Sequence, residues 1–164
     1  MKKWHKHLVL LVALLVGAMV LRALIPSDER RVHALLSQMV REINEQPRGG
    51  TFSELAAANR VADYFGPEFE IRINATGAPE LDISDRSELI QMLLSARRSS
   101  RGVKVALLDP QTVGISKTNA VVEATGKAEI SGDTDIFVSE LRFTLVKIDR
   151  RWRIRRVETI RTFE

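Results

Sequence analysis

A chain of 164 residues is long enough for one domain and an appendage but not for two full domains. It contains no cysteine, which excludes disulfides, thiol catalysis and cysteine metal sites. Four of its 25 Lys and Arg residues, and none of its 21 Asp and Glu residues, lie in residues 1–26. Residues 27–164 are therefore formally neutral, which argues against a nucleic-acid-binding domain, because such domains need surplus positive charge.

Residues 1–26 combine a basic head with an apolar run. Three lysines precede residues 8–25, which carry one charged side chain, Arg22. In a helix this run spans about 27 Å, close to the hydrocarbon thickness of a bilayer. We therefore predict a single-pass transmembrane anchor in the cytoplasmic membrane. The lysines place its N-terminus in the cytoplasm, so residues 27–164 are expected outside it, in a periplasmic or extracellular space.

A cleaved signal peptide is the alternative interpretation of this segment, and it would leave the domain secreted. The best small-residue cleavage site is Val16–Ala18, and cleavage there would leave the apolar residues 19–26 on the mature protein. A buried core helix is a further alternative, which the lysine-rich head disfavours. The sequence favours the uncleaved anchor.

Three amphipathic helices are predicted in residues 27–164. The first begins at Ser27, which is followed by two acidic residues, and its apolar residues recur at helical spacing as far as Ile43. The third begins at Asp85, with Glu88 in its first turn, and ends before residues 99–102.

The second helix is expected to begin at Thr51, which would form a capping box with Glu54. Gly66-Pro67 is expected to end this helix. The apolar stripe predicted for it comprises Phe52, Leu55, Ala58, Ala62 and Phe65.

Strands are predicted where the apolar period is two. Residues 74–82 are expected to form a loop, and residues 149–151 a turn. Asp109-Pro110 predicts a bulge or a sheet edge, and Arg155-Arg156 predicts a bulge in the last strand. The predicted strands are a short one at Phe69–Ile73, one that begins at Val103, and three at Asn119–Ile130, Ile136–Ile148 and Trp152–Ile160.

The long strands each have one apolar and one polar face, as expected for a sheet that is packed on one side. Three amphipathic helices are sufficient to cover that face. The sequence therefore predicts an α+β domain with a curved sheet wrapped on helices.

Two passages resemble the nuclear transport factor two-like superfamily, with SnoaL-like proteins as the most similar subgroup. They are "ADYFGPEFEIRI" at residues 62–73 and "SELRFTLVKIDRRWRIRRVE" at residues 139–158. The resemblance covers residues 28–162. It implies a cone-shaped half-barrel of mostly antiparallel sheet on three helices, with an apolar pocket at its wide end. It also implies homodimerisation through the sheet as a common arrangement.

The best-known chemistry of that superfamily is not matched here. In isomerase-like members a catalytic Asp follows the first strand, and Ile73 or Asn74 occupies that position in this chain. Neither residue can act as a general base. Those members also have a tyrosine on the first helix, which here has none. The sequence therefore favours a protein that is not an enzyme, and no cofactor or metal is expected, since residues 27–164 contain one histidine.

Four residues are candidates to line the implied pocket: His33, Tyr64, Asn74 and Ser139. A surface position is the alternative for His33, and ordinary packing is the alternative for Tyr64 and Ser139. Asn74 also begins an Asn-Ala-Thr glycosylation sequence, a motif that is frequent by chance.

Four charged residues on the polar face of the last two strands are candidates for an interface: Glu140, Arg142, Arg153 and Arg155. Their proximity predicts cross-strand charge pairs. The alternative is a solvated sheet face.

Three functions are consistent with these features. We favour a membrane-anchored, extracytoplasmic binding or interaction module that takes a small apolar ligand and does not catalyse a reaction. The first alternative is a small-molecule lyase, isomerase or hydrolase of the SnoaL or ketosteroid isomerase type. The second is a scaffold subunit of an envelope or secretion assembly.

Overall fold

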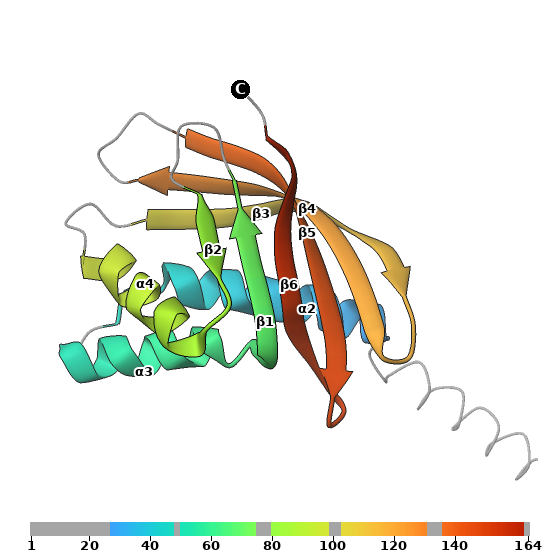
Figure 1. Ribbon diagram of the computed structural model, residues 1–164, viewed down its shortest axis with the longest axis horizontal. Coiled ribbons are helices and arrows are strands. Elements are labelled where there is room, and N and C mark those ends of the chain that lie inside the picture. Colours follow the sequence, from blue (N-terminus) through green and yellow to red (C-terminus); the bar gives the residue numbers. More distant parts are fainter. Residues whose placement is uncertain (1–26, 48–49, 75–79, 99–102, 131–135, 163–164) are drawn as a thin grey trace, which may run out of the picture.

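A computed structural model describes residues 27–47, 50–74, 80–98, 103–130 and 136–162 (Figure 1). The predicted membrane segment and its signal-peptide alternative lie outside these residues. No helix within the described ranges is long and apolar enough to cross a membrane. The described part is an α+β domain with one open, curved sheet and helices on one of its faces.

The first and third predicted helices are confirmed as α2 (Asp28–Asn44) and α4 (Arg86–Arg98). Ser27 caps α2, because its Oγ accepts a hydrogen bond from the Arg30 amide at 3.3 Å. The Asp85 carboxylate accepts two amides of the first turn of α4, which lowers the pKa of that carboxyl.

The middle helix, α3 (Thr51–Ala62), differs from the prediction in its cap and in its buried face. Gly50 occupies the N-cap position with a positive φ of 76° and no side-chain hydrogen bond, so the predicted Thr51–Glu54 capping box does not form. Phe52 is 89% exposed and Leu55 is exposed as well. The buried face consists of small residues that let α3 pack closely on α4, namely Ala57, Ala58, Val61 and Ala62.

The sheet has six strands in the order β2-β1-β6-β5-β4-β3. β1 and β6 are parallel, and every other neighbouring pair is antiparallel. Gly66-Pro67 belongs to β1 rather than to the end of a helix, and β2 lies within the predicted loop. The strands are β1 (Phe65–Ile73), β2 (Leu81–Ile83), β3 (Val103–Ile115), β4 (Asn119–Ile130), β5 (Ile136–Ile148) and β6 (Arg151–Thr162).

Both predicted irregularities of the sheet are confirmed. The register of β3 on β4 shifts between Leu108 and Gln111, where Asp109 has a φ of 49°, and β3 is also an edge strand. The register of β6 on β5 shifts so that Thr144 pairs with Arg156 and Leu145 pairs with Ile154. The extra residue in β6 is Arg155, which is why Ile154 and Val157 can both be buried on the same face.

The core lies between the helices and the inner face of the sheet. α2 crosses the sheet and contacts β3 and β6, and α3 packs against α2 and α4. The most deeply buried side chains come from all of these layers and include Val32, Leu36, Val61, Val122, Leu145 and Ile154. The alternation in the long strands therefore predicted the buried face correctly.

The charge pairs on the outer face are not the predicted ones. Arg142 donates to Glu123 on β4 at 2.7 Å and lies 3.8 Å from Glu158 on β6. The bulge at Arg155 shifts the register of β6 by one residue, so Glu158 stands opposite Arg142.

Glu140 and the two β6 arginines are likewise placed elsewhere than predicted. Glu140 stands opposite Thr125, and Arg153 donates a hydrogen bond to the Asp63 carbonyl oxygen. Arg155 is exposed at the bulge. The predicted pairing of Glu140 and Arg142 with Arg153 and Arg155 is therefore wrong, whereas an interface role of these residues stays a prediction.

Candidate functional site

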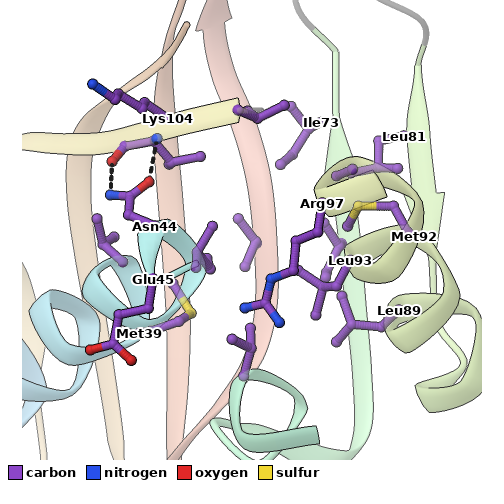
Figure 2. Close-up of a pocket in the computed structure, with 18 of the residues that line it drawn as sticks. Met39, Asn44, Glu45, Ile73, Leu81, Leu89, Met92, Leu93, Arg97 and Lys104 are labelled. Carbon is purple, nitrogen blue, oxygen red and sulfur yellow. Dashed lines mark hydrogen bonds between the residues drawn. The ribbon is translucent and has the colours of Figure 1, made fainter. Parts of the chain in front are cut away.

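A cavity of about 610 Å³ lies between the sheet and the three helices (Figure 2). This volume falls within the range of about 300–1,000 Å³ that is typical of small-molecule sites. Its inner wall is apolar and includes Met39 from α2, Ile71 from β1, Leu89 and Leu93 from α4, Phe143 from β5 and Val157 from β6. Since these residues come from two helices and three strands, the cavity depends on the packing of the whole domain.

The mouth of the cavity is formed by exposed polar residues, which shows that it opens to solvent. Glu45 and Gln46 follow α2, and Lys104 lies at the start of β3. The Asn44 side chain donates to the Val105 carbonyl at 2.7 Å and accepts the Val105 amide at 2.8 Å (Figure 2). Asn44 thus hydrogen-bonds the free edge of β3 as a neighbouring strand would, and it fixes the end of α2 at the mouth.

Arg97 from α4 brings a positive charge into this wall. Figure 2 shows its side chain extending from α4 toward α2, near Leu89 and Leu93. Its two terminal nitrogens donate to the carbonyl oxygens of Glu42 at 3.0 Å and Glu54 at 3.3 Å. Desolvation by burial lowers the pKa of the guanidinium, and repulsion from Arg60 adds to the effect.

The carboxylates near Arg97 are already engaged with other cations. Glu54 lies 3.6 Å from Arg98, and Glu42 lies 3.4 Å from Arg60. Glu42 also accepts the hydroxyl of Tyr64 at 2.8 Å. Within the described ranges, Arg97 itself forms no ion pair with a carboxylate.

Tyr64 and His33, two of the predicted pocket residues, lie outside the lining of the cavity. Tyr64 packs against the core, and burial together with the Glu42 hydrogen bond raises the pKa of its hydroxyl to about 12. His33 is half-buried on α2, where its Nε2 lies 2.7 Å from the Thr112 hydroxyl of β3. Each residue therefore links two elements of the fold.

Asn74 and Ser139 also lie outside the lining. The backbone N–H of Asn74 donates to the Thr159 hydroxyl at 3.0 Å, which joins the end of β1 to β6. Ser139 is buried, as its position on the apolar side of β5 predicted, and its Oγ has no hydrogen-bond partner among the described residues. The structure thus brings none of the four predicted residues together at the cavity.

Sequence reasoning missed Arg97, although its spacing carried a signal. Arg97 follows Leu89 and Leu93 at intervals of four residues, which puts all three on one face of a helix. It also lies in the last turn of α4, where basic residues commonly interact with the helix dipole in solvent. That common role predicts an exposed side chain, so the inward position of Arg97 was not expected.

The lining of the cavity combines apolar and charged side chains. Ile73, one of the two residues at the position of the isomerase-type Asp, lines the cavity with an alkyl side chain. In the part of the chain that the structure describes, no group of three or more His, Asp or Glu residues could hold a metal ion. What the site offers is an apolar surface, the guanidinium groups of Arg97 and Arg98, and the carboxylates of Glu45 and Glu54.

No protein-family model matches the chain, and a comparison with curated proteins gave no match either. Many solved structures do match it. A Novosphingobium aromaticivorans protein with the provisional name scytalone dehydratase is 16% identical, with a TM-score of 0.60 over 83% of this chain and 85% of that one.

Two further structures show the same likeness. A nuclear transport factor two-like protein with a cystatin-like fold, also from Novosphingobium aromaticivorans, is 14% identical, with a TM-score of 0.60 over 87% of this chain and 85% of that one. A protein of unknown function with a cystatin-like fold from Nostoc punctiforme is 11% identical, with a TM-score of 0.59 over 80% of this chain and 89% of that one. At these identities the likeness concerns the fold, and the described domain has the cystatin-like fold of nuclear transport factor two-like proteins.

Proposed function

We propose that this domain binds a small, largely apolar molecule in the cavity and does not transform it. The observation that carries the proposal is the cavity itself, which has the size of a ligand site and an apolar wall contributed by α2, α4 and three strands. Binding an apolar molecule there would remove the surface of the ligand and that of the cavity wall from water. The favourable free energy is about 25 cal/mol for each Å² of apolar surface buried.

Enzymatic activity of the scytalone dehydratase kind is the alternative, because one similar structure bears that provisional name. Such chemistry needs a group that takes or gives a proton at the substrate. Tyr64, with a pKa raised to about 12, is turned toward Glu42, and Ile73 cannot titrate. These features support binding without catalysis.

Photolabelling of the full-length protein in lipid nanodiscs would test the proposal. Dodecanol and dodecanoic acid, each carrying a diazirine, serve as the two probes, and mass spectrometry locates the labelled peptides. We expect at least one probe to label the cavity wall around Met39, Leu89 and Phe143. The label on the nanodisc scaffold protein measures how much of each probe partitions into lipid.

A variant that fills the cavity provides the matched control. Leu93 is buried in the wall, so Leu93→Trp should abolish the cavity label. Phe52 is exposed outside the lining, so Phe52→Trp adds a comparable ring and should leave the label unchanged. Failure of both probes to label the wild-type cavity would refute the proposed function.

We also propose that residues 8–25 tether this domain to the outer side of the cytoplasmic membrane. The support is the lysine-rich head followed by an apolar run of membrane-spanning length, in which Arg22 is the one charged residue. A tether would hold the cavity near a bilayer, where apolar molecules are most concentrated. Dimerisation through the sheet and a role as an assembly scaffold stay predictions.

A further inference from the structure

Arg97 places a guanidinium in a wall that is otherwise built largely from apolar side chains. Leu89 and Leu93 precede it on the same face of α4, and Met39 approaches from α2 (Figure 2). A positive charge in such surroundings loses hydration, and it is stable only where hydrogen bonds or an opposite charge replace the lost water. The compensation available to Arg97 therefore indicates what the cavity accepts.

The hydrogen bonds of Arg97 compensate its charge in part. One N–H on each terminal nitrogen is used, by the carbonyl oxygens of Glu42 and Glu54. Each terminal nitrogen carries a second N–H. In the described ranges these have no acceptor, and the buried Nε has none either.

No carboxylate forms an ion pair with Arg97 in the described ranges, although Glu54, Glu42 and Glu45 attract it at longer range. The nearest carboxylates belong to Glu42 and Glu54, which face Arg60 and Arg98. Two backbone carbonyls explain how Arg97 holds α4 against α2 and α3, yet a neutral donor could do the same at a lower desolvation cost. The two carbonyl contacts thus account for the position of Arg97 and leave its full charge unaccounted for.

We infer that the cavity binds an apolar molecule that carries a single carboxylate, and that Arg97 holds this carboxylate through its free N–H groups. This inference rests on the proposed binding function and specifies the ligand class. A guanidinium matches a carboxylate in geometry as well as in charge, because two parallel N–H donors can meet two oxygens.

The surrounding charges favour a monoanion over a phosphate. The carboxylates of Glu54, Glu42 and Glu45 all act on Arg97 from nearby. A dianion would meet their repulsion at close range, and Arg97 is the one arginine of the lining without an ion pair in the described ranges, since Arg98 pairs with Glu54. A single negative charge is balanced by Arg97 alone, and the apolar remainder of the ligand would extend along the wall toward Phe143.

Competition in the photolabelling experiment tests this inference on the full-length protein in nanodiscs. Unlabelled dodecanoic acid and dodecanol differ in the head group alone, and an alkaline buffer keeps the acid ionised. After correction for partitioning into lipid, we expect dodecanoic acid to displace the cavity label about 10- to 100-fold more effectively, the range given by a hydrogen-bonded charge.

Three variants separate charge recognition from a structural role. Arg97→Met keeps the apolar stem and should abolish the preference for the acid. Arg97→Lys loses the fork that reaches the Glu42 and Glu54 carbonyls but keeps the charge, so it should retain part of the preference. Arg155→Met removes an exposed arginine away from the cavity and should retain all of it.

The outcomes are distinct. Equal displacement by acid and alcohol in the wild type overturns the inference and leaves the binding function intact. A preference that survives Arg97→Met overturns it as well. If Arg97→Met does not fold, the wild-type comparison and Arg97→Lys decide, whereas a cavity that neither probe labels refutes the proposed function itself.

Discussion

Trp152 joins three parts of the domain through one side chain. It is 5% exposed, at the start of β6, and its Nε1 donates to the Asp28 carboxylate at 3.3 Å. Lys147 lies 5.1 Å from the ring centroid and donates to the same carboxylate at 2.7 Å. The contacts tie the β5–β6 hairpin to the first turn of α2.

Replacing Trp152 with Ala should therefore lower the free energy of unfolding by about 3–5 kcal/mol, as for other large aromatic side chains that are removed from a core. Urea denaturation followed by circular dichroism measures the change. Arg155→Ala, at the exposed bulge of the same strand, is expected to change it by no more than about 0.5 kcal/mol. Equal losses in both variants would contradict the inward placement of Trp152.

Asp28 gives the stability of the domain a dependence on pH. The hydrogen bond from Lys147, followed by that from Trp152, lowers the pKa of this carboxyl below its ordinary value of 3.8. The stabilisation is therefore complete above about pH 3.8 and is lost as the pH falls through the lower pKa of the folded state. Because the carboxylate is partly exposed, we expect its ionisation to contribute less than about 1 kcal/mol to the free energy of unfolding.

The measurement compares urea denaturation of the wild type and Asp28→Asn at neutral and at strongly acidic pH. The wild type should be the more stable protein at neutral pH, and the difference should shrink on acidification. A difference that stays constant with pH would show that the carboxylate contributes through its shape rather than its charge.

At the scale of elements, Asn44 fastens the end of α2 to the edge of β3. Asn44→Ala removes both hydrogen bonds to Val105 and is expected to cost about 1–2 kcal/mol of stability. Asn44→Asp keeps the acceptor for the Val105 amide but sets a carboxylate oxygen against the Val105 carbonyl, so its cost should be at least as large. Hydrogen exchange checks the mechanism: the Val105 amide should exchange faster in Asn44→Ala than in Asn44→Asp, and equal rates would refute it.

The strands could be predicted wherever the strand itself is long enough to show alternating apolar and polar residues. Residues 119–130 and 136–148 alternate strictly, and the structure gives both strands the predicted bounds. β2 was missed because its three residues, Leu81–Ile83, are too short to show a period. The predicted stripe of α3 was right at Ala58 and Ala62 and wrong at Phe52 and Leu55, because packing against α4 selected small residues rather than large ones.

The site was harder to predict than the fold, because a cavity is defined by distances between elements. Tyr64 and His33 were candidates by their chemistry, and their partners, Glu42 and Thr112, are set by tertiary packing. Arg97 is separated from Arg98, its neighbour in the same turn, by its four-residue spacing from Leu93, a signal too weak on its own to mark a site. The inward register of α4 distinguishes the two.

At the scale of the whole molecule, the basic residues of the domain are balanced by acids on the sheet. Arg142 lies beside Glu123 and Glu158, and Arg156 lies 2.9 Å from Glu70. The surplus charge resides in residues 1–26, next to the apolar run. This distribution fits attraction to a membrane surface better than to nucleic acid.

The proposed anchor at residues 8–25 predicts that the full-length protein sediments with membranes and resists extraction by alkaline carbonate. The same proposal predicts that protease added to intact spheroplasts degrades residues 27–164. A protein that lacks residues 1–26 serves as the control and should not sediment. Release of the full-length protein by carbonate, or its protection from protease, would contradict the proposed anchoring.

The place of β6 in the sheet also determines when the domain can form during synthesis. It lies between β1 and β5, although it is the last strand in chain order. A nascent chain that has reached Ile148 can form β2-β1 and β5-β4-β3, but no hydrogen bonds join these two pieces. The apolar inner face is thus left without Trp152, Ile154 and Val157 until the final strand emerges. The two pieces of the sheet are therefore joined only when β6 pairs with both β1 and β5.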